Sequence, residues 1–196
     1  MSRRTPRTWS ALSRDDMHYL RANLEIAPEN GPEDPQAQRV YAAAANVIDE
    51  LLPVWTKTEV EANVRAFATQ RGLRIKLRWR RELNGGFAFV GRGGGTILLD
   101  AEKNSGEYFY VNEGEHIASL VLHELAHVLT PNLWRRPARY SSLGFQSHGP
   151  EFVRCYLNLL AQHIDTRKAV AAFEFLGVEI APEGEPCHQR SLPGCL

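Results

Sequence analysis

Cysteine is scarce in this chain of 196 residues, which has only Cys155, Cys187 and Cys195. An odd number of cysteines gives no disulfide framework, so a reducing compartment such as the cytoplasm is the simplest location. A chain of this length can bury a core without disulfides, and its 43% hydrophobic content is ordinary for a soluble globular protein. We expect Cys155 to be a small buried apolar residue.

Long hydrophobic runs and an excess of either charge are also missing. No segment approaches the roughly twenty apolar residues of a membrane span, and the basic stretch Met1–Trp9 lacks the apolar run of a signal peptide. The glycine clusters at 84–86 and 91–95 lack the Gly-Lys-Ser/Thr ending of a phosphate-binding loop, so they predict turns. We therefore expect no membrane partner and no nucleotide cofactor.

The hydrophobic pattern predicts a mixture of helices and strands without internal repeats. Residues 1–35 combine a basic arm, a short helix at 13–26 and a proline-rich linker, residues 36–180 form the main domain, and residues 181–196 are an irregular tail. Further helices are expected at 36–52, 58–70, 115–130 and 150–164, and strands at 73–80, 87–90, 96–100 and 108–111. This order predicts an α+β fold.

The most informative segment is His123-Glu124-Leu125-Ala126-His127. Apolar residues recur around it at helical spacing on almost every side, and the exception is the stripe formed by Ser119, His123 and His127. One turn of helix places both imidazoles on this stripe. Because burying unpaired imidazoles is unfavourable, the pattern favours a metal site over two core histidines.

A catalytic zinc site needs three protein ligands and one open position, so a third ligand must follow. The extended motif HExxHxxGxxH is absent, because Thr130 and Leu133 stand where its glycine and last histidine would be. The candidates are His148 and Glu151, at the start of the helix expected at 150–164. We prefer His148, because Glu151 has an alternative role in favouring the positive end of the helix dipole.

The pair of motifs HELAH and HGPEF, at residues 123–127 and 148–152, resembles the SprT-like domain of the SprT and Spartan proteins. The small metallohydrolases of actinobacteria and their phages share a similar helix. The resemblance covers roughly residues 40–165. It implies a zincin-like α+β fold, in which N-terminal helices and a small, mostly antiparallel sheet pack on the HExxH helix and C-terminal helices follow. It also implies one zinc ion on His123, His127 and His148, with Glu124 as general base.

The chain departs from that family in two respects. Many SprT-like proteins carry a C-terminal zinc ribbon with paired CxxC motifs, whereas this tail has only Cys187, His188 and Cys195. The additional DNA-binding elements of Spartan proteins are not recognisable in this sequence. We therefore expect no second zinc module, and the natural substrate does not follow from the resemblance.

The expected function is that of a zinc-dependent peptidase. Zinc lowers the pKa of its bound water, and Glu124 would take a proton as this water attacks a peptide or amide carbonyl. Tyr140 or Arg139, in the segment between the ligands, could stabilise the oxyanion. The alternative is a catalytically inactive zincin-like protein that binds DNA or a protein partner, although Glu124 favours the enzyme because a structural metal site needs no base.

Two strands invite functional hypotheses. Residues Arg74 to Arg80 alternate basic and apolar side chains, so one side of this strand could contact nucleic-acid phosphates. The formal net charge of zero instead favours a solvated antiparallel edge strand. In zinc peptidases an edge strand beside the active helix can pair with an extended substrate, and we expect Thr96 to Asp100 to do so.

Overall fold

The computed structural model describes residues 9–26, 35–81, 83, 86–91, 93–101, 115–130 and 148–183. Within these residues the fold is α+β, as predicted, and combines helices with two small sheets. The elements are η1 (Trp9–Ala11), α1 (Arg14–Ile26), α2 (Pro35–Ala43), η2 (Ala44–Ile48), η3 (Asp49–Leu51), β1 (Val54–Thr56), α3 (Lys57–Gln70), β2 (Arg74–Arg80), β3 (Gly86–Gly91), β4 (Gly94–Asp100), β5 (Glu115–Ile117), α4 (Ala118–Leu129), α5 (Pro150–Leu160) and α6 (Arg167–Phe175).

The larger sheet has the strand order β2-β4-β3. Strands β3 and β4 form an antiparallel hairpin, whereas β2 and β4 run parallel; the short strands β1 and β5 form a separate antiparallel pair. The larger sheet therefore has one antiparallel and one parallel pairing, so it is mixed, whereas a mostly antiparallel sheet was predicted. Gly93 has a φ of 79°, which suits glycine at the tight turn between β3 and β4.

The hypothesis that Thr96 to Asp100 is an edge strand is wrong. These residues belong to β4, which has β2 on one side and β3 on the other. The sequence did not show this, because β4 pairs with β2 although β3 lies between these two strands in the sequence. Among the described residues β3 and β2 are the edges, and β3 is the edge strand that packs beside α4.

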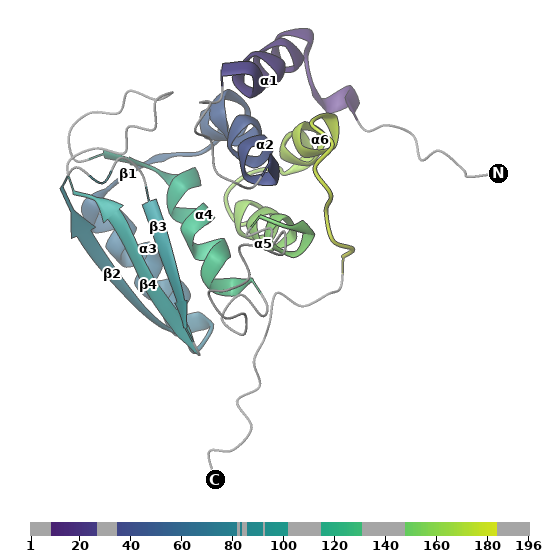
Figure 1. Ribbon diagram of the computed structural model, residues 1–196. Helices are drawn as coiled ribbons and strands as arrows, with labels where there is room; N and C mark the ends of the chain where they lie inside the picture. Colours follow the sequence, from purple (N-terminus) through teal and green to yellow (C-terminus); the bar gives the residue numbers. More distant parts are fainter. Residues whose placement is uncertain are drawn as a thin grey trace.

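Helix α4 lies between the larger sheet and the helices α2, α5 and α6 (Figure 1). It contacts β3 and β4 on one side and α5 on the other, while α3 packs against β2. Ten of its twelve residues are buried, which follows from apolar side chains on almost every side of the helix. Leu20 of α1 is also fully buried and belongs to the same hydrophobic core.

Local interactions fix the beginnings of the two helices that flank α4 in the fold. Thr56 and Glu59 form a capping box at the start of α3, in which each side chain accepts a hydrogen bond from the other residue's backbone N–H. Pro150 occupies the first turn of α5, where its missing N–H costs nothing. The end of α5 at Leu160 comes earlier than the predicted boundary at residue 164.

Most of the predicted elements are confirmed within the described residues, although some boundaries differ. The predicted helix at 115–130 begins only at Ala118, because residues 115–117 form β5 and pair with β1. Strand β1 and helix α6 were not predicted, and the strand expected at 108–111 lies outside the described residues. Cys155 is 1% exposed, which confirms its expected burial. None of the described helices is both long enough and apolar enough to cross a membrane.

Candidate metal centre

Two of the three candidate ligands come from a single turn of α4. His123 and His127 lie four residues apart, and the Nε2 atoms of their rings are 3.2 Å apart. Their side of the helix is the polar stripe that the sequence indicated. Because the rest of α4 is packed against the sheet and α5, His123 is buried and His127 is partly buried.

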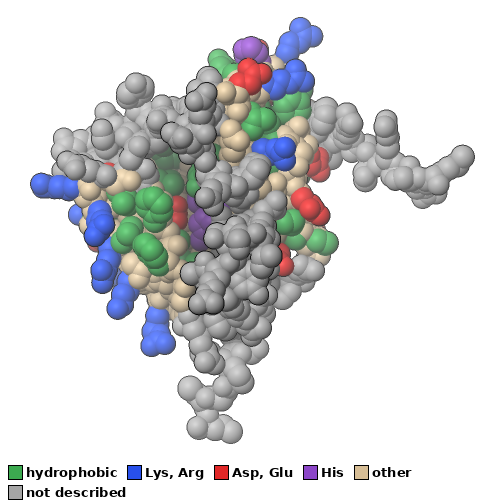
Figure 2. All heavy atoms as spheres, viewed as in Figure 1, with side chains coloured by type: hydrophobic (Ala, Val, Ile, Leu, Met, Phe, Trp, Pro, Cys, Tyr) green, Lys and Arg blue, Asp and Glu red, His purple; other side chains and the backbone are tan. Residues whose placement is uncertain are grey.

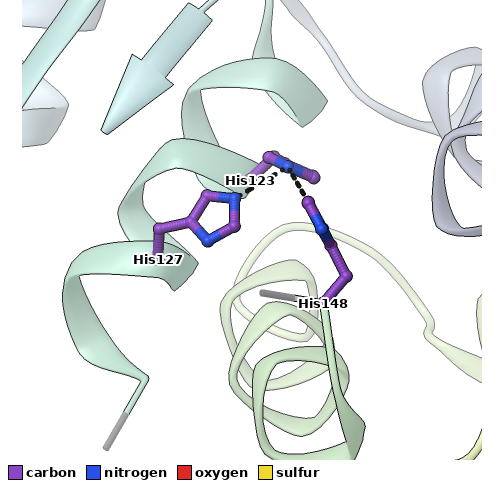
Figure 3. Close-up of side chains that lie close together, drawn as sticks. All are labelled: His123, His127 and His148. Carbon is purple, nitrogen blue, oxygen red and sulfur yellow. Dashed lines mark hydrogen bonds between the residues drawn. The ribbon is translucent and has the colours of Figure 1, made fainter. Parts of the chain in front are cut away.

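The third ring comes from the residue that lies two positions before α5. The Nε2 atom of His148 is 3.1 Å from that of His123, and the whole residue is 6% exposed. Figure 3 shows the two rings of α4 and the ring of His148 turned toward one another. The candidate ligand atoms of the three histidines all lie within 4.8 Å of one another, so the cluster could hold a metal ion.

Of the other candidates for ligand or oxyanion stabiliser that the sequence suggested, only Glu151 lies within the described residues. Glu151, the rival to His148, is exposed in the first turn of α5 and is not part of the three-histidine group. Tyr140 and Arg139, the candidate oxyanion stabilisers, lie outside the described residues. The structure therefore brings together the histidine triad that the sequence predicted.

The geometry of the triad fits a metal ion better than hydrogen bonds among the rings. The Nε2 of His123 is 3.1 to 3.2 Å from the Nε2 atoms of both other rings. It has either one N–H or one lone pair, so it cannot form a good hydrogen bond to each. A tetrahedral zinc ion with bonds of about 2.1 Å would place its nitrogen ligands about 3.4 Å apart. The observed separations are close to that value.

Electrostatics also favour neutral rings. Burial, followed by repulsion from His148, lowers the pKa of His127 to about 3. Burial and the neighbouring histidines hold the pKa of His123 well below its ordinary value. Both rings are therefore uncharged at neutral pH, with lone pairs available to a metal.

Aromatic side chains surround the three imidazoles and restrict their orientation. The Phe152 ring lies 4.4 to 4.9 Å, centroid to centroid, from the rings of all three histidines. Tyr41 of α2 stacks on His123 at 5.0 Å and lies 5.6 Å from His148. Tyr41 is itself 44% exposed, unlike the buried rings of His123 and His148. Nothing in the sequence linked Tyr41 to the motif, because its position depends on how α2 packs.

Glu124 faces the sheet side of α4. It is 2% exposed, and burial raises the pKa of its carboxyl to about 8. Gly86, the first residue of β3, lies directly against it: a Cβ at this glycine would be 2.9 Å from Glu124 Cγ and 3.1 Å from Oε1. The edge strand therefore passes the carboxylate closely only because Gly86 has no side chain. The sequence indicated a turn at this glycine and gave no sign of the contact.

A second carboxyl, that of the partly buried Asp49, contacts the polar stripe of α4. Asp49 of η3 hydrogen-bonds the side chain of Ser119, one turn before His123 on α4, and burial raises its pKa to about 7. The Oδ1 atom of Asp49 has no hydrogen-bond partner in the described structure. The hydroxyl of Tyr156 donates to the backbone carbonyl oxygen of Ser119 across 3.4 Å. Asp49 was not singled out in the sequence, because only the helix packing brings it to the polar stripe.

No family model, curated protein or solved structure matches this chain. The chemistry of the three-histidine cluster must therefore be inferred from its own residues and their surroundings.

Metal content tests the cluster directly. We expect protein purified without added metal to contain about one zinc per chain, because three imidazole ligands and one open position suit zinc. His148→Ala should lose most of this metal while remaining folded, whereas His18→Ala, which removes an exposed histidine of α1, should retain it. At a zinc concentration 100-fold above the Kd, the metal should add about 2.7 kcal/mol of stability to the wild type. Elemental mass spectrometry measures the zinc content, and thermal unfolding measures the stability. Equal zinc content in His148→Ala and His18→Ala would contradict the ligand assignment.

Asp49 should make stability depend on pH. Its pKa rises from 3.8 to about 7 on folding, so it destabilises the fold increasingly as pH rises through this interval, and the penalty is complete above about 7. Asp49→Asn should therefore stabilise the protein at pH 8 by up to about 4 kcal/mol and change little below pH 4. Urea unfolding of both proteins across this range measures the difference. A constant difference at all pH values would show that the carboxyl does not titrate in this way.

Proposed function

We propose that this protein is a zinc-dependent hydrolase of peptide or amide bonds with a zincin-like site. The observation that carries the proposal is that three imidazoles converge and that the helix carrying two of them, α4, also carries a buried carboxyl. His123 and His127 belong to one side of α4, and Glu124 belongs to the adjacent side. A structural metal site requires only the ligands, so the neighbouring carboxyl favours catalysis.

The donor set favours zinc as the metal. Three imidazole nitrogens with one remaining coordination position are typical of catalytic zinc, which accepts nitrogen ligands in tetrahedral geometry. When bound, zinc acts as a Lewis acid that acidifies a water molecule and polarises a carbonyl oxygen. The aromatic rings of Phe152 and Tyr41 hold the imidazoles in place around this position.

Glu124 would move the protons of the reaction. Burial holds its pKa at about 8, close to neutral pH, and this suits a group that both accepts and returns a proton. In this proposal the carboxylate accepts a proton from the attacking water and then delivers it to the leaving amine. The contact with Gly86 keeps the carboxyl in one position between α4 and the edge strand.

The edge strand β3 is the place where an extended substrate would pair. Among the described residues its only strand neighbour is β4, so its other edge is available for backbone hydrogen bonds. A peptide along this edge would pass Gly86 and hence Glu124. We therefore propose β3, in place of β4, as the strand that pairs with the substrate. Pairing of this kind requires an extended protein or peptide as substrate.

The resemblance to SprT-like domains is part of the proposal. An HExxH helix beneath a small sheet, followed by a helix that begins beside the third histidine, supports a zincin-like fold. The roles of His123, His127, His148 and Glu124 agree with those that the resemblance implies. The natural substrate still does not follow from it.

Hydrolysis of an unstructured protein tests the proposal. Wild-type protein loaded with zinc should cleave fluorescently labelled casein, and Glu124→Gln should reduce the rate by about 10²- to 10⁴-fold because it removes the proton acceptor. Glu124→Gln should keep its zinc, since the ligands are intact. Equal rates in the two proteins would contradict the role of Glu124, and a zinc-loaded wild type that cleaves no peptide or amide substrate would contradict the proposed activity.

The contact between Gly86 and Glu124 gives a second test. Gly86→Ala places a methyl group against the Glu124 side chain, so the carboxyl must move by a few tenths of an ångström. We expect kcat to fall between about 10- and 100-fold, with zinc retained, because proton transfer depends on position. Gly91→Ala, in the same strand, is the matched control, since its Cβ would approach only the Gly94 carbonyl oxygen at 3.9 Å. Equal kcat values for the two variants would exclude a positioning role for Gly86.

A further inference from the structure

The face of the larger sheet that points away from α3 and α4 carries an unusual combination of side chains. Every second residue of β2 points to this face, and these residues are exposed and basic. The apolar residues between them are partly buried. Two phenylalanines of β3 are also exposed, Phe87 at 54% and Phe89 at 62%. We call this surface the basic-aromatic face; its residues are Arg74, Lys76, Arg78, Arg80, Phe87 and Phe89.

The strand register orders these side chains in rows across the sheet. Residues that are paired across neighbouring strands point to the same side, so each row runs from β2 through β4 to β3. The two central rows are Arg78, Leu98 and Phe87, and then Lys76, Thr96 and Phe89. Both have a cation at one end and a phenylalanine at the other. The face therefore repeats one unit, with a spacing of about 7 Å along the strands.

Within the part of the chain that the structure describes, the cations and the phenylalanines of this face are exposed. Helices α3 and α4 pack on the opposite side of the sheet, and Figure 2 shows hydrophobic side chains on the near side of the sheet beside a row of basic side chains. Asp100, which is opposite Arg80 in the register, is 2% exposed and accepts a hydrogen bond from the Leu83 backbone N–H. Among the described residues, the exposed part of the face is thus positively charged although the whole chain has no net charge.

A solvated edge strand explains the basic residues but leaves the phenylalanines unexplained. Charged side chains on β2 would discourage aggregation, as the sequence suggested. Two large aromatic rings exposed side by side on the neighbouring hairpin would have the opposite effect. A ligand that needs both anion recognition and flat apolar contact accounts for the two features together.

We propose that the basic-aromatic face binds a single-stranded nucleic acid. Its phosphates would follow the cations of β2, and successive bases would reach across Thr96 and Leu98 to stack on Phe89 and Phe87. The combination of a basic track with aromatic rings is the general chemistry of sequence-independent binding to single strands. A duplex fits less well, because its bases are already stacked and cannot reach the rings.

The proposal is independent of the metal centre. The face is on the opposite side of the sheet from α4, and none of its residues belongs to the three-histidine group. The two sites share only strand β3, whose Gly86 lies against the Glu124 side chain while its exposed phenylalanines point to the outer face. Binding should therefore persist in Glu124→Gln, even if the hydrolase proposal fails.

Fluorescence anisotropy with a labelled oligothymidylate of about 12 nucleotides tests the proposal on the full chain. We expect binding at about 50 mM salt, and a loss of affinity of at least fivefold for Phe87→Ala or Phe89→Ala, because each removes one stacking partner. Phe89→Trp should restore binding, since a larger ring still stacks. Lys76→Gln with Arg78→Gln should weaken binding and reduce the slope of log K against log salt by about 1.4, at about 0.7 for each phosphate that the protein no longer neutralises.

Matched controls distinguish binding at the basic-aromatic face from non-specific attraction of the nucleic acid to any exposed cation. Arg65→Gln removes an exposed cation of α3, on the other side of the sheet, and should leave binding unchanged. Absence of binding by a folded, zinc-loaded wild type would overturn the proposal. So would equal affinity for the same sequence as a duplex, or full binding by Phe87→Ala. Vesicles containing phosphatidylserine should not bind; if they bind through these residues while the oligonucleotide does not, the proposal is overturned and the partner is a membrane surface.

Discussion

Three buried imidazole nitrogens that face one another impose the central constraint on this protein. They cannot all be satisfied by hydrogen bonds, because the Nε2 of His123 lies at hydrogen-bonding distance from two others and has one proton or one lone pair to offer. A cation shared by the three rings removes the conflict. The same requirement joins α4 to the start of α5, and with it the sheet to the C-terminal helices.

Helix α4 presents its metal-ligand candidates to one neighbouring element and its carboxyl to another. Its histidine side faces α5 and the aromatic rings of Phe152 and Tyr41, whereas Glu124 faces β3. Burial acts in opposite directions on the two kinds of group, since it lowers the pKa of His123 and of His127 and raises that of the Glu124 carboxyl. The interior thus favours uncharged metal ligands and a carboxyl that exchanges protons near neutral pH.

Sequence patterns predicted the parts of the site that depend on local spacing. The four-residue separation of His123 and His127 on an apolar helix, and the position of His148 before Pro150, were sufficient to predict the triad. Tyr41 and Asp49 were missed, because their approach to α4 depends on how distant helices pack. The contact of Gly86 with Glu124, and the middle position of β4, depend likewise on strand order, which alternation along one strand cannot reveal.

X-ray absorption at the zinc edge tests the central claim most directly. In zinc-loaded wild-type protein, we predict three nitrogen ligands at about 2.0 to 2.1 Å with the multiple scattering of imidazole, and one further light atom. His148→Ala should show one imidazole fewer, or no bound zinc. A sulfur ligand at about 2.3 Å, or an unchanged number of imidazoles in His148→Ala, would contradict the three-histidine centre.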